Sequence, residues 1–280
     1  MRRRIAHGCG ALVLGALLTA GCSATDDGAD SDAGKGEARE PAGGEGTGFT
    51  PDPDRVPADR ERAAELAEAV VAQPETFGPG FVEAEGRSGD TGEWPVLDEN
   101  CVWVLEPVPD GVLASLTRHA ELPAEDGADP LRVTAVATVH SDPRGAEWEM
   151  ARTVEDALRC PDQQLRRDEW VSGLISVAME FGTLGNSATE DLLTETGSFH
   201  SDELGGPHDF EWMRARIGPL TLAVSAKGAD GRGDGEVSRA AVEALGLMSS
   251  RAENELAPEP SGPGGEEDKN ESGNEKGENR

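Results

Sequence analysis

Apolar and polar residues alternate along residues 131–140, with apolar side chains at the odd-numbered positions. A period of two predicts a strand with one buried face. Residues 170–181 are rich in β-branched side chains and contain a glycine, which favours a strand over a helix. Residues 210–215 and 220–226 flank a Gly-Pro pair and predict an antiparallel hairpin.

Helical spacing separates these strands. Apolar residues recur at i, i+3, i+4 and i+7 after Asp59, which predicts a helix that begins at this N-cap and ends before Pro74. A second helix is expected between the Asp142-Pro143 start signal and Cys160. Residues 237–248 predict a last amphipathic helix. For the second helix we expect the apolar side to consist of Met150, Val154, Ala157 and Leu158.

The order of these elements is helix, irregular segment, strand, helix, strands, hairpin and helix. Consecutive strands form an antiparallel sheet most simply, so the sequence predicts an α+β domain with helices packed on one face of the sheet. We place this domain at residues 59–256. Residues 22–58 are expected to be a disordered acidic tether and residues 257–280 a disordered acidic tail, because both have too few apolar side chains to offset their ordering entropy.

The first 22 residues have the layout of a secretory signal. Three arginines, Arg2 to Arg4, precede a short apolar run that ends in small residues before Cys22. The run is shorter than the roughly 20 residues that span a bilayer. The segment resembles the lipobox of bacterial lipoproteins, which implies a signal peptide at 1–21 and a lipid on Cys22, with acyl chains such as palmitate. The protein is then expected on the extracytoplasmic face of the cell membrane. The alternative is an ordinary secreted protein that is cut nearby.

Composition narrows the classes of partner. The net charge is -30, which argues against nucleic acid as a partner and against docking on anionic lipid headgroups. The predicted mature chain is more acidic still, because the signal peptide contains arginines and no acids. Such a surface favours solubility. The abundance of Ala, Gly, Asp, Glu and Arg resembles that of actinobacterial proteins.

Of the four cysteines, Cys9 lies in the signal peptide and Cys22 is the predicted lipid acceptor. Cys101 and Cys160 remain. The compartment outside the membrane is oxidising, so we predict that they form a disulfide if the fold brings them together. The alternative is two buried free thiols.

A family resemblance rests on the same elements. The strand at 131–140, the Ser141-Asp142-Pro143 turn, the helix that ends in Cys160, and Cys101 before the strand resemble the family of the extracellular sensor domain of mycobacterial serine/threonine kinase H. That family includes actinobacterial lipoproteins and packs helices on an antiparallel sheet around a broad cleft. The resemblance covers about residues 61–256 and implies a sensor-like, non-enzymatic domain. It supplies no catalytic residues. The family typically has a second disulfide, which this chain cannot form.

Motifs for chemistry are sparse. The sequence contains no G-x-S-x-G elbow, no P-loop and no H-E-x-x-H motif. His200 and His208 lie near Asp202 and Asp209, which are ligand types that zinc accepts. However, the glycines between them predict a solvated loop, and we expect no metal there. Three acids form a weaker calcium candidate without the EF-hand pattern, and a simple turn is the favoured interpretation. They are Asp230, Asp234 and Glu236.

Four tryptophans are either cleft-lining or core residues, and the core is the favoured interpretation. They are Trp103, Trp148, Trp170 and Trp212. The leading functional hypothesis is therefore a membrane-anchored envelope lipoprotein whose domain binds an unidentified ligand or protein, without a cofactor. One alternative is an envelope hydrolase or metal-dependent enzyme that uses His200, His208 and nearby acids. Another is a structural or accessory subunit of an envelope complex.

Overall fold

An eight-stranded sheet runs through the part of the chain that the computed structural model describes, which is residues 49–84, 89, 91–180, 186, 189–233 and 235–259. The strand order is β1-β4-β5-β10-β9-β8-β7-β6, and neighbouring strands are antiparallel. Two further strands, β2 (Glu93–Leu97) and β3 (Trp103–Pro107), form a separate antiparallel hairpin. The strands of the large sheet are β1 (Val82–Glu83), β4 (Val112–Leu122), β5 (Leu131–His140), β6 (Gln163–Arg166), β7 (Glu169–Glu180), β8 (Asp191–Ser201), β9 (Gly205–Ile217) and β10 (Leu220–Lys227).

The helices begin where the sequence signals predict. In α1 (Arg60–Val70), the Asp59 side chain accepts a hydrogen bond from the backbone N–H of Arg62, and in α2 (Pro143–Arg159) the Asp142 side chain accepts from that of Gly145. A short 3-10 helix, η1 (Pro74–Phe77), follows α1, and α3 (Glu236–Leu256) ends the described chain. Among the described residues, no helix has both the length and the apolar character needed to cross a membrane.

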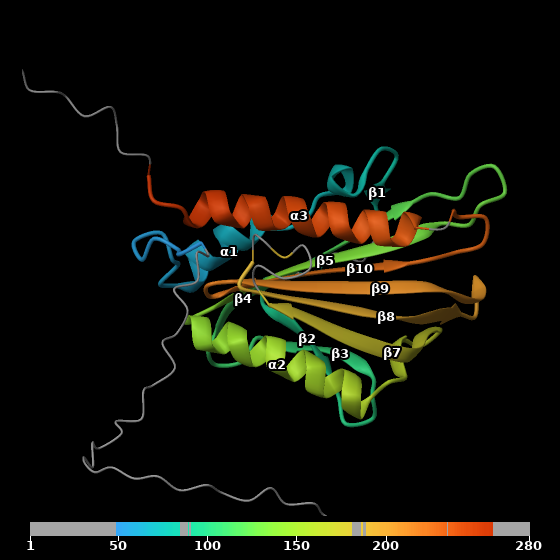
Figure 1. The fold of residues 1–280 in the computed structure, drawn as a ribbon, viewed down its shortest axis with the longest axis horizontal. Coiled ribbons are helices and arrows are strands. Elements are labelled where there is room, and N and C mark those ends of the chain that lie inside the picture. The colour runs from blue at the N-terminus through green and yellow to red at the C-terminus, as the bar shows by residue number, and fades with distance from the viewer. Residues whose placement is uncertain are drawn as a thin grey trace, which may run out of the picture. The chain divides into compact units, whose positions relative to one another are not determined.

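The helices cover both faces of the sheet (Figure 1). Helices α1 and α3 lie on one face, whereas α2 and the β2–β3 hairpin lie on the other. The antiparallel α+β class is thus confirmed, with α2 placed opposite the other two helices rather than beside them. The physical reason is that the central strands are buried on both sides. On β5 even Thr138 and His140, at the predicted polar positions, are 2% and 3% exposed.

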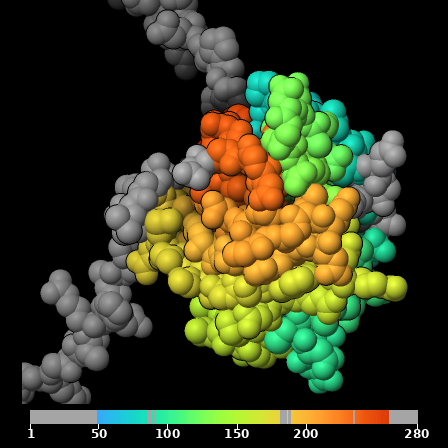
Figure 2. Space-filling model, turned by 90° about the vertical axis from the view of Figure 1, so that its right-hand side faces the viewer, coloured from blue at the N-terminus to red at the C-terminus, as the bar shows by residue number. Residues whose placement is uncertain are grey.

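The main core lies between the sheet and helices α1 and α3. Leu220, Leu222 and Val224 of β10 are fully buried there, together with Ala241 and Met248 of α3. A smaller apolar cluster lies toward β7 and is formed by Val171, Leu174, Phe199 and Phe210. Figure 2 shows the orange β8–β10 region between the orange-red end of α3 and the yellow-green segments that follow α2.

Residues 49–58 belong to the folded unit, although the sequence assigned them to the tether. Phe49 and Val56 pack against the main core. The backbone N–H of Asp52 donates to the carbonyl oxygen of Leu256 at 2.8 Å. The segment is held by these two apolar side chains and by hydrogen bonds from Asp52 and Arg55 to the end of α3, which the sequence alone does not reveal. The predicted signal peptide, Cys22, residues 22–48 of the tether and residues 260–280 of the tail lie outside the described residues.

Two further local expectations need correction. The buried side of α2 is formed by Ala146, Met150, Thr153 and Ala157, whereas Leu158 is 81% exposed because it lies one residue beyond that stripe. The segment expected to be irregular contains β2, β3 and β4.

Candidate ligand-binding site

A cavity of about 470 Å³ lies on the face of the sheet that α2 and the β2–β3 hairpin cover. Its floor is made by alternate residues of two neighbouring strands in the interior of the sheet, β10 and β5. Thr221, Ala223, Ser225 and Lys227 of β10 line it, and Thr134, Val136 and Thr138 of the paired strand β5 extend it. A strand rises about 3.3 Å per residue, so the floor is about 20 Å long from Thr221 to Lys227.

The walls of the cavity are mainly aromatic and aliphatic, and Glu93 of β2 is an acidic lining residue. Trp103 from β3 and Trp212 from β9 meet edge to face, with ring centroids 5.0 Å apart. The expectation that the tryptophans are core residues is therefore wrong for this pair. It is also wrong for Trp148 and Trp170, which are 66% and 40% exposed. The other apolar lining residues are Pro95, Val104, Leu105, Leu165 and Phe210.

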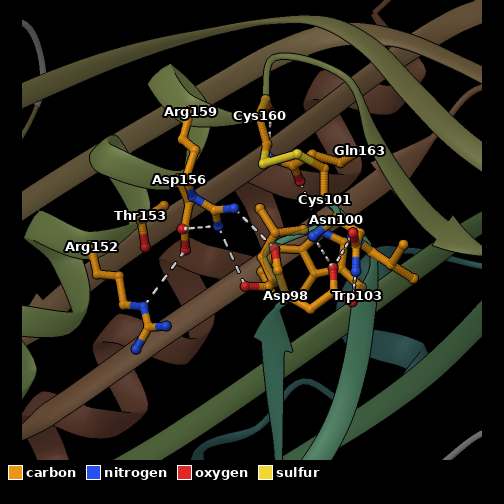
Figure 3. A network of polar contacts seen from close by, with 12 residues as sticks. Asp98, Asn100, Cys101, Trp103, Arg152, Thr153, Asp156, Arg159, Cys160 and Gln163 are labelled. Atoms are coloured by element: carbon orange, nitrogen blue, oxygen red, sulfur yellow. Dashed lines mark hydrogen bonds and ion pairs between the residues drawn. A yellow bond between two sulfur atoms is a disulfide. The ribbon is translucent and has the colours of Figure 1, made fainter.

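The β2–β3 wall is fastened to the C-terminal end of α2 (Figure 3). Cys101 and Cys160 form the predicted disulfide, with Cα atoms 5.6 Å apart. Arg159 donates to the backbone carbonyl oxygens of Leu97 and Asp98 at 3.5 and 3.0 Å. Hydrogen bonds from the backbone N–H groups of Val102 and Asn100 lower the pKa of the Asp98 carboxyl. The wall is thus crosslinked to a helix and held by several polar contacts.

At one end of the cavity, the negative charge of Glu149 is balanced by the positive charge of Arg214. Glu149 of α2 accepts hydrogen bonds from Arg214 at 2.8 Å and from the hydroxyl of Thr221 at 2.6 Å, and its other contact is His140 Nε2 at 2.8 Å. Burial raises the pKa of Glu149, but the His140 hydrogen bond, the Arg214 charge and the Thr221 hydroxyl more than offset this, and the pKa lies below its ordinary value. Trp94 covers the His140 ring edge-on, with centroids 5.7 Å apart.

The His140–Glu149 pair combines an imidazole with a carboxylate, as many catalytic sites do, but the imidazole does not reach the cavity. The imidazole is 3% exposed, and its Nδ1 lies against Gly145, where a Cβ atom would come within 2.9 Å. His140 is also absent from the lining of the cavity, so its ring does not reach a bound molecule. The pair has the geometry of a structural anchor between α2 and the sheet.

The opposite end of the cavity is cationic. Glu169 of β7 contacts Lys227 at 2.6 Å, Arg132 at 2.9 Å and Arg166 at 3.9 Å. Burial raises the pKa of Glu169, but these three cations more than offset it and hold the pKa below its ordinary value. Burial lowers the pKa of Lys227, and Glu169 opposes that effect. Lys227 and Arg166 line the cavity.

A small chamber of about 30 Å³ adjoins the cavity beneath the β2–β3 hairpin. Glu195 of β8 lines it and is 2% exposed, with no hydrogen-bond partner for its Oε1 atom. Burial raises the pKa of Glu195 to about 7, although the charge of Arg214 opposes this. The residues that line both spaces are Pro95, Trp103, Glu149, Trp212 and Arg214.

The candidate metal ligands lie away from the cavity. His200 and His208 are on strands β8 and β9 rather than in a solvated loop. His200 stacks on Trp170 and contacts the Ser172 hydroxyl at 3.0 Å, whereas His208 contacts the carbonyl oxygen of Leu204 at 3.0 Å. Within the described ranges, no group of three or more His, Cys, Asp or Glu residues is placed to hold a metal ion. Asp234 of the calcium candidate lies outside those ranges.

Sequence reasoning missed the charged residues of the cavity. Glu149, Lys227 and Arg166 are far apart in the chain, and only the strand register and the position of α2 bring them to one space. A signal was present on β10, where Thr221, Ser225 and Lys227 occupy alternate positions of an otherwise apolar strand. Such a pattern on a central strand indicates a second, polar face that something must cover.

Comparisons with known proteins give structural neighbours at low identity. No protein-family model matches the chain, and no curated protein matches it. Among solved structures, the extracellular domain of PknH from Mycobacterium tuberculosis is 9% identical, with a TM-score of 0.41, covering 72% of this chain and 100% of that domain. An uncharacterised protein of Mycobacterium smegmatis, the Rv0999 ortholog, is 14% identical, with a TM-score of 0.32, covering 68% of this chain and 98% of that one. The domain that the sequence resembles is thus among its structural neighbours.

Proposed function

We propose that this protein is an envelope lipoprotein, anchored through Cys22, whose extracytoplasmic domain binds a small molecule in the 470 Å³ cavity without transforming it. The cavity is the observation that carries the proposal. Its volume lies within the range of about 300–1,000 Å³ that is typical of ligand sites, and its lining combines aromatic walls with a few polar groups.

The polar groups of the cavity favour binding over catalysis. Glu149 and Glu169 are both engaged by cations, and their lowered pKa values make them poor proton acceptors. The hydroxyl of Thr221 donates to Glu149, which is in turn bonded to His140, so the imidazole does not face the hydroxyl as a general base would. These contacts support binding over the hydrolase alternative. The cavity lining also contains a histidine in contact with a hydroxyl, His119 Nδ1 and Thr134 Oγ1, at 2.9 Å.

The experiment uses a neutral fluorescent probe, N-phenyl-1-naphthylamine, with the full chain carrying Cys22→Ser so that no detergent is needed. We expect saturable fluorescence enhancement. Ala223→Phe places a ring on the cavity floor and should abolish the enhancement. The matched control is Ala178→Phe, since Ala178 is an exposed residue of β7 outside the cavity.

The proposal would be overturned if the fluorescence enhancement were not saturable. It would also be overturned if the Ala223→Phe variant and the protein with the native Ala223 gave equal enhancement. The unfolding midpoint of each variant is measured in parallel. If Ala223→Phe unfolds, the smaller change Ala223→Leu is used in its place, with Ala178→Leu as its control.

A further inference from the structure

We propose that the ligand is an anionic amphiphile, whose carboxylate or phosphate group lies at the Lys227 and Arg166 end of the cavity while its apolar part lies along the Trp103 and Trp212 wall. This inference rests on the proposed function and specifies the chemistry of the molecule that the cavity binds.

The first argument for an anionic ligand comes from the charged side chains around Glu169. Three cationic side chains lie within 4.0 Å of one carboxylate that is 1% exposed. The second acid in the group, Glu203, contacts Arg132 from outside with a side chain that is 65% exposed. The side chains of Lys227 and Arg132 are 8% and 12% exposed, whereas that of Arg166 is 34% exposed. Three cationic side chains close together attract an anion to this end of the cavity.

The second argument is that Lys227 lines the cavity and does not lie on the outer surface of the protein. It is 7% exposed, and it occupies the β10 position beside Phe210 in the strand register. Its ammonium group also lies 5.4 Å from the centre of the Phe199 ring. A buried ammonium group that lines an apolar cavity forms strong charge-assisted hydrogen bonds, because water does not compete for it.

The opposite end of the cavity sets the orientation of the ligand. Glu149 is paired with Arg214, and the Thr221 hydroxyl donates to the same carboxylate. One anion and one cation cancel there, so that end offers no net charge to an anionic group. The cationic groups and the neutral pair lie at opposite ends of a floor about 20 Å long, which suits an elongated molecule with one charged end.

The apolar part of the ligand has a matching surface between the two ends. Trp103, Trp212, Leu105 and Leu165 line the walls, and Val136 and Ala223 lie in the floor. A fatty-acid-like or aryl-alkyl chain removes apolar surface from water on both sides when it lies between these groups. The overall charge of -30 would repel an anion, so the cationic end opposes the field of the rest of the protein.

The test is displacement of the bound naphthylamine probe by four amphiphiles with the same twelve-carbon chain, below their micelle concentrations. Laurate and dodecyl phosphate are the anions, dodecanol is neutral, and dodecyltrimethylammonium is the cation. We expect the better of the two anions to displace the probe at about tenfold lower concentration than dodecanol, as one charge-assisted contact predicts. The cation should be weakest. Laurate and dodecyl phosphate also distinguish a carboxylate from a phosphate as the preferred group.

Two variants locate the charged group. Lys227→Met should raise the concentration of laurate or dodecyl phosphate needed by about tenfold and leave dodecanol unchanged. Lys227→Met also removes an ion-pair partner of Glu169. Arg166→Gln is a smaller change at the same site, and we expect it to raise the required concentration of the anion by a smaller factor. The matched control is Arg239→Gln, since Arg239 forms a similar i,i+3 pair with Glu236 at 3.8 Å on the exposed side of α3.

The two proposals fail in different ways. If the probe binds in the cavity but dodecanol or the cation displaces it as well as both anions, the anionic ligand is rejected while the binding function stands. Equal effects of Arg166→Gln and Arg239→Gln on displacement by the anions would reject the assigned position. If the probe does not bind in the cavity, the proposed function itself fails.

Discussion

The indole N–H of Trp103 donates to Oε1 of Gln163 at 2.8 Å, across the same junction that the disulfide closes. Gln163 in turn donates to the carbonyl oxygen of Cys160 at 3.1 Å. The aromatic wall of the cavity is therefore held by one covalent and several polar contacts to the segment that follows α2. Removing the covalent contact should loosen the wall and destabilise the fold.

The double variant Cys101→Ser, Cys160→Ser should lower the free energy of unfolding by about 2–4 kcal/mol, because the disulfide closes a loop of 59 residues. Urea unfolding measures the change. The naphthylamine probe should also bind more weakly at the same temperature. Equal unfolding midpoints for the oxidised wild type, the reduced wild type and the double variant would contradict this prediction.

Glu195 should make stability depend on pH in an unusual direction. Its pKa is raised to about 7 from an ordinary 4.5, so between these values the folded protein holds a proton that the unfolded chain has released. The free energy of unfolding should therefore fall as the pH rises from about 4.5 to about 7, by up to about 3 kcal/mol, and stay level above that. Glu195→Gln should remove this component. We expect the wild type and the variant to be similar at pH 5, and the variant to be more stable at pH 8. A stability difference that does not change with pH would rule out the titration.

Glu149→Gln should lower the free energy of unfolding by about 3 kcal/mol at pH 7, because it leaves the buried guanidinium of Arg214 without its compensating charge. The matched control is Glu147→Gln on the same helix, where the side chain is 57% exposed and the change should stay within about 0.5 kcal/mol. Since the pKa of Glu149 is lowered in the folded protein, its contribution is present above the unfolded pKa and is lost as the pH falls through the folded pKa. A wild type and variant of equal stability at pH 7 would show that the pair contributes nothing.

Deletion of residues 49–58 should destabilise the protein, because it removes Phe49 and Val56 from the core and the Asp52 contact from Leu256. Deleting the equally long segment 39–48 provides the control, and its composition predicts no loss of stability. Thermal unfolding of both variants measures the difference. Equal melting temperatures would mean that residues 49–58 contribute little to the fold.

Cys22→Ser should move the protein from the membrane fraction to the medium, because the variant has no acceptor for the predicted lipid. Fractionation with labelled fatty acid tests this. The anchor would be rejected if wild-type protein carried no label and the variant still sedimented with membranes.

Local signals in the sequence predicted the elements that depend on neighbouring residues. Asp59 and Asp142 cap their helices because an N-cap side chain reaches only the first turn. The bounds predicted from the alternation along residues 131–140 match those of β5, because an alternating pattern can be recognised without distant information. The pairing of Cys101 with Cys160 followed from the compartment and from the absence of other thiols in the predicted domain.

The cavity could not be predicted because its parts meet only through the strand register. β4 carries Thr117 and His119 toward the cavity, and its mixture of polar and apolar residues predicted no strand. Glu169 and Lys227 are separated by 58 residues and become neighbours only after β7, β8, β9 and β10 have paired. Trp103 and Trp212 were placed wrongly for the same reason, since they belong to β3 and β9, which meet only in the folded protein.

The order of the strands links the cavity to the last stage of folding. β4 pairs with β5, and β6 to β10 pair successively, so each group forms through contacts that are close in sequence. The pairing of β5 with β10 joins the two groups and carries the largest loop-closure cost, which makes it the slowest step expected in assembly. The cavity floor straddles this seam. A molecule held there stabilises the fully assembled domain alone, so occupancy should raise the melting temperature and slow global unfolding.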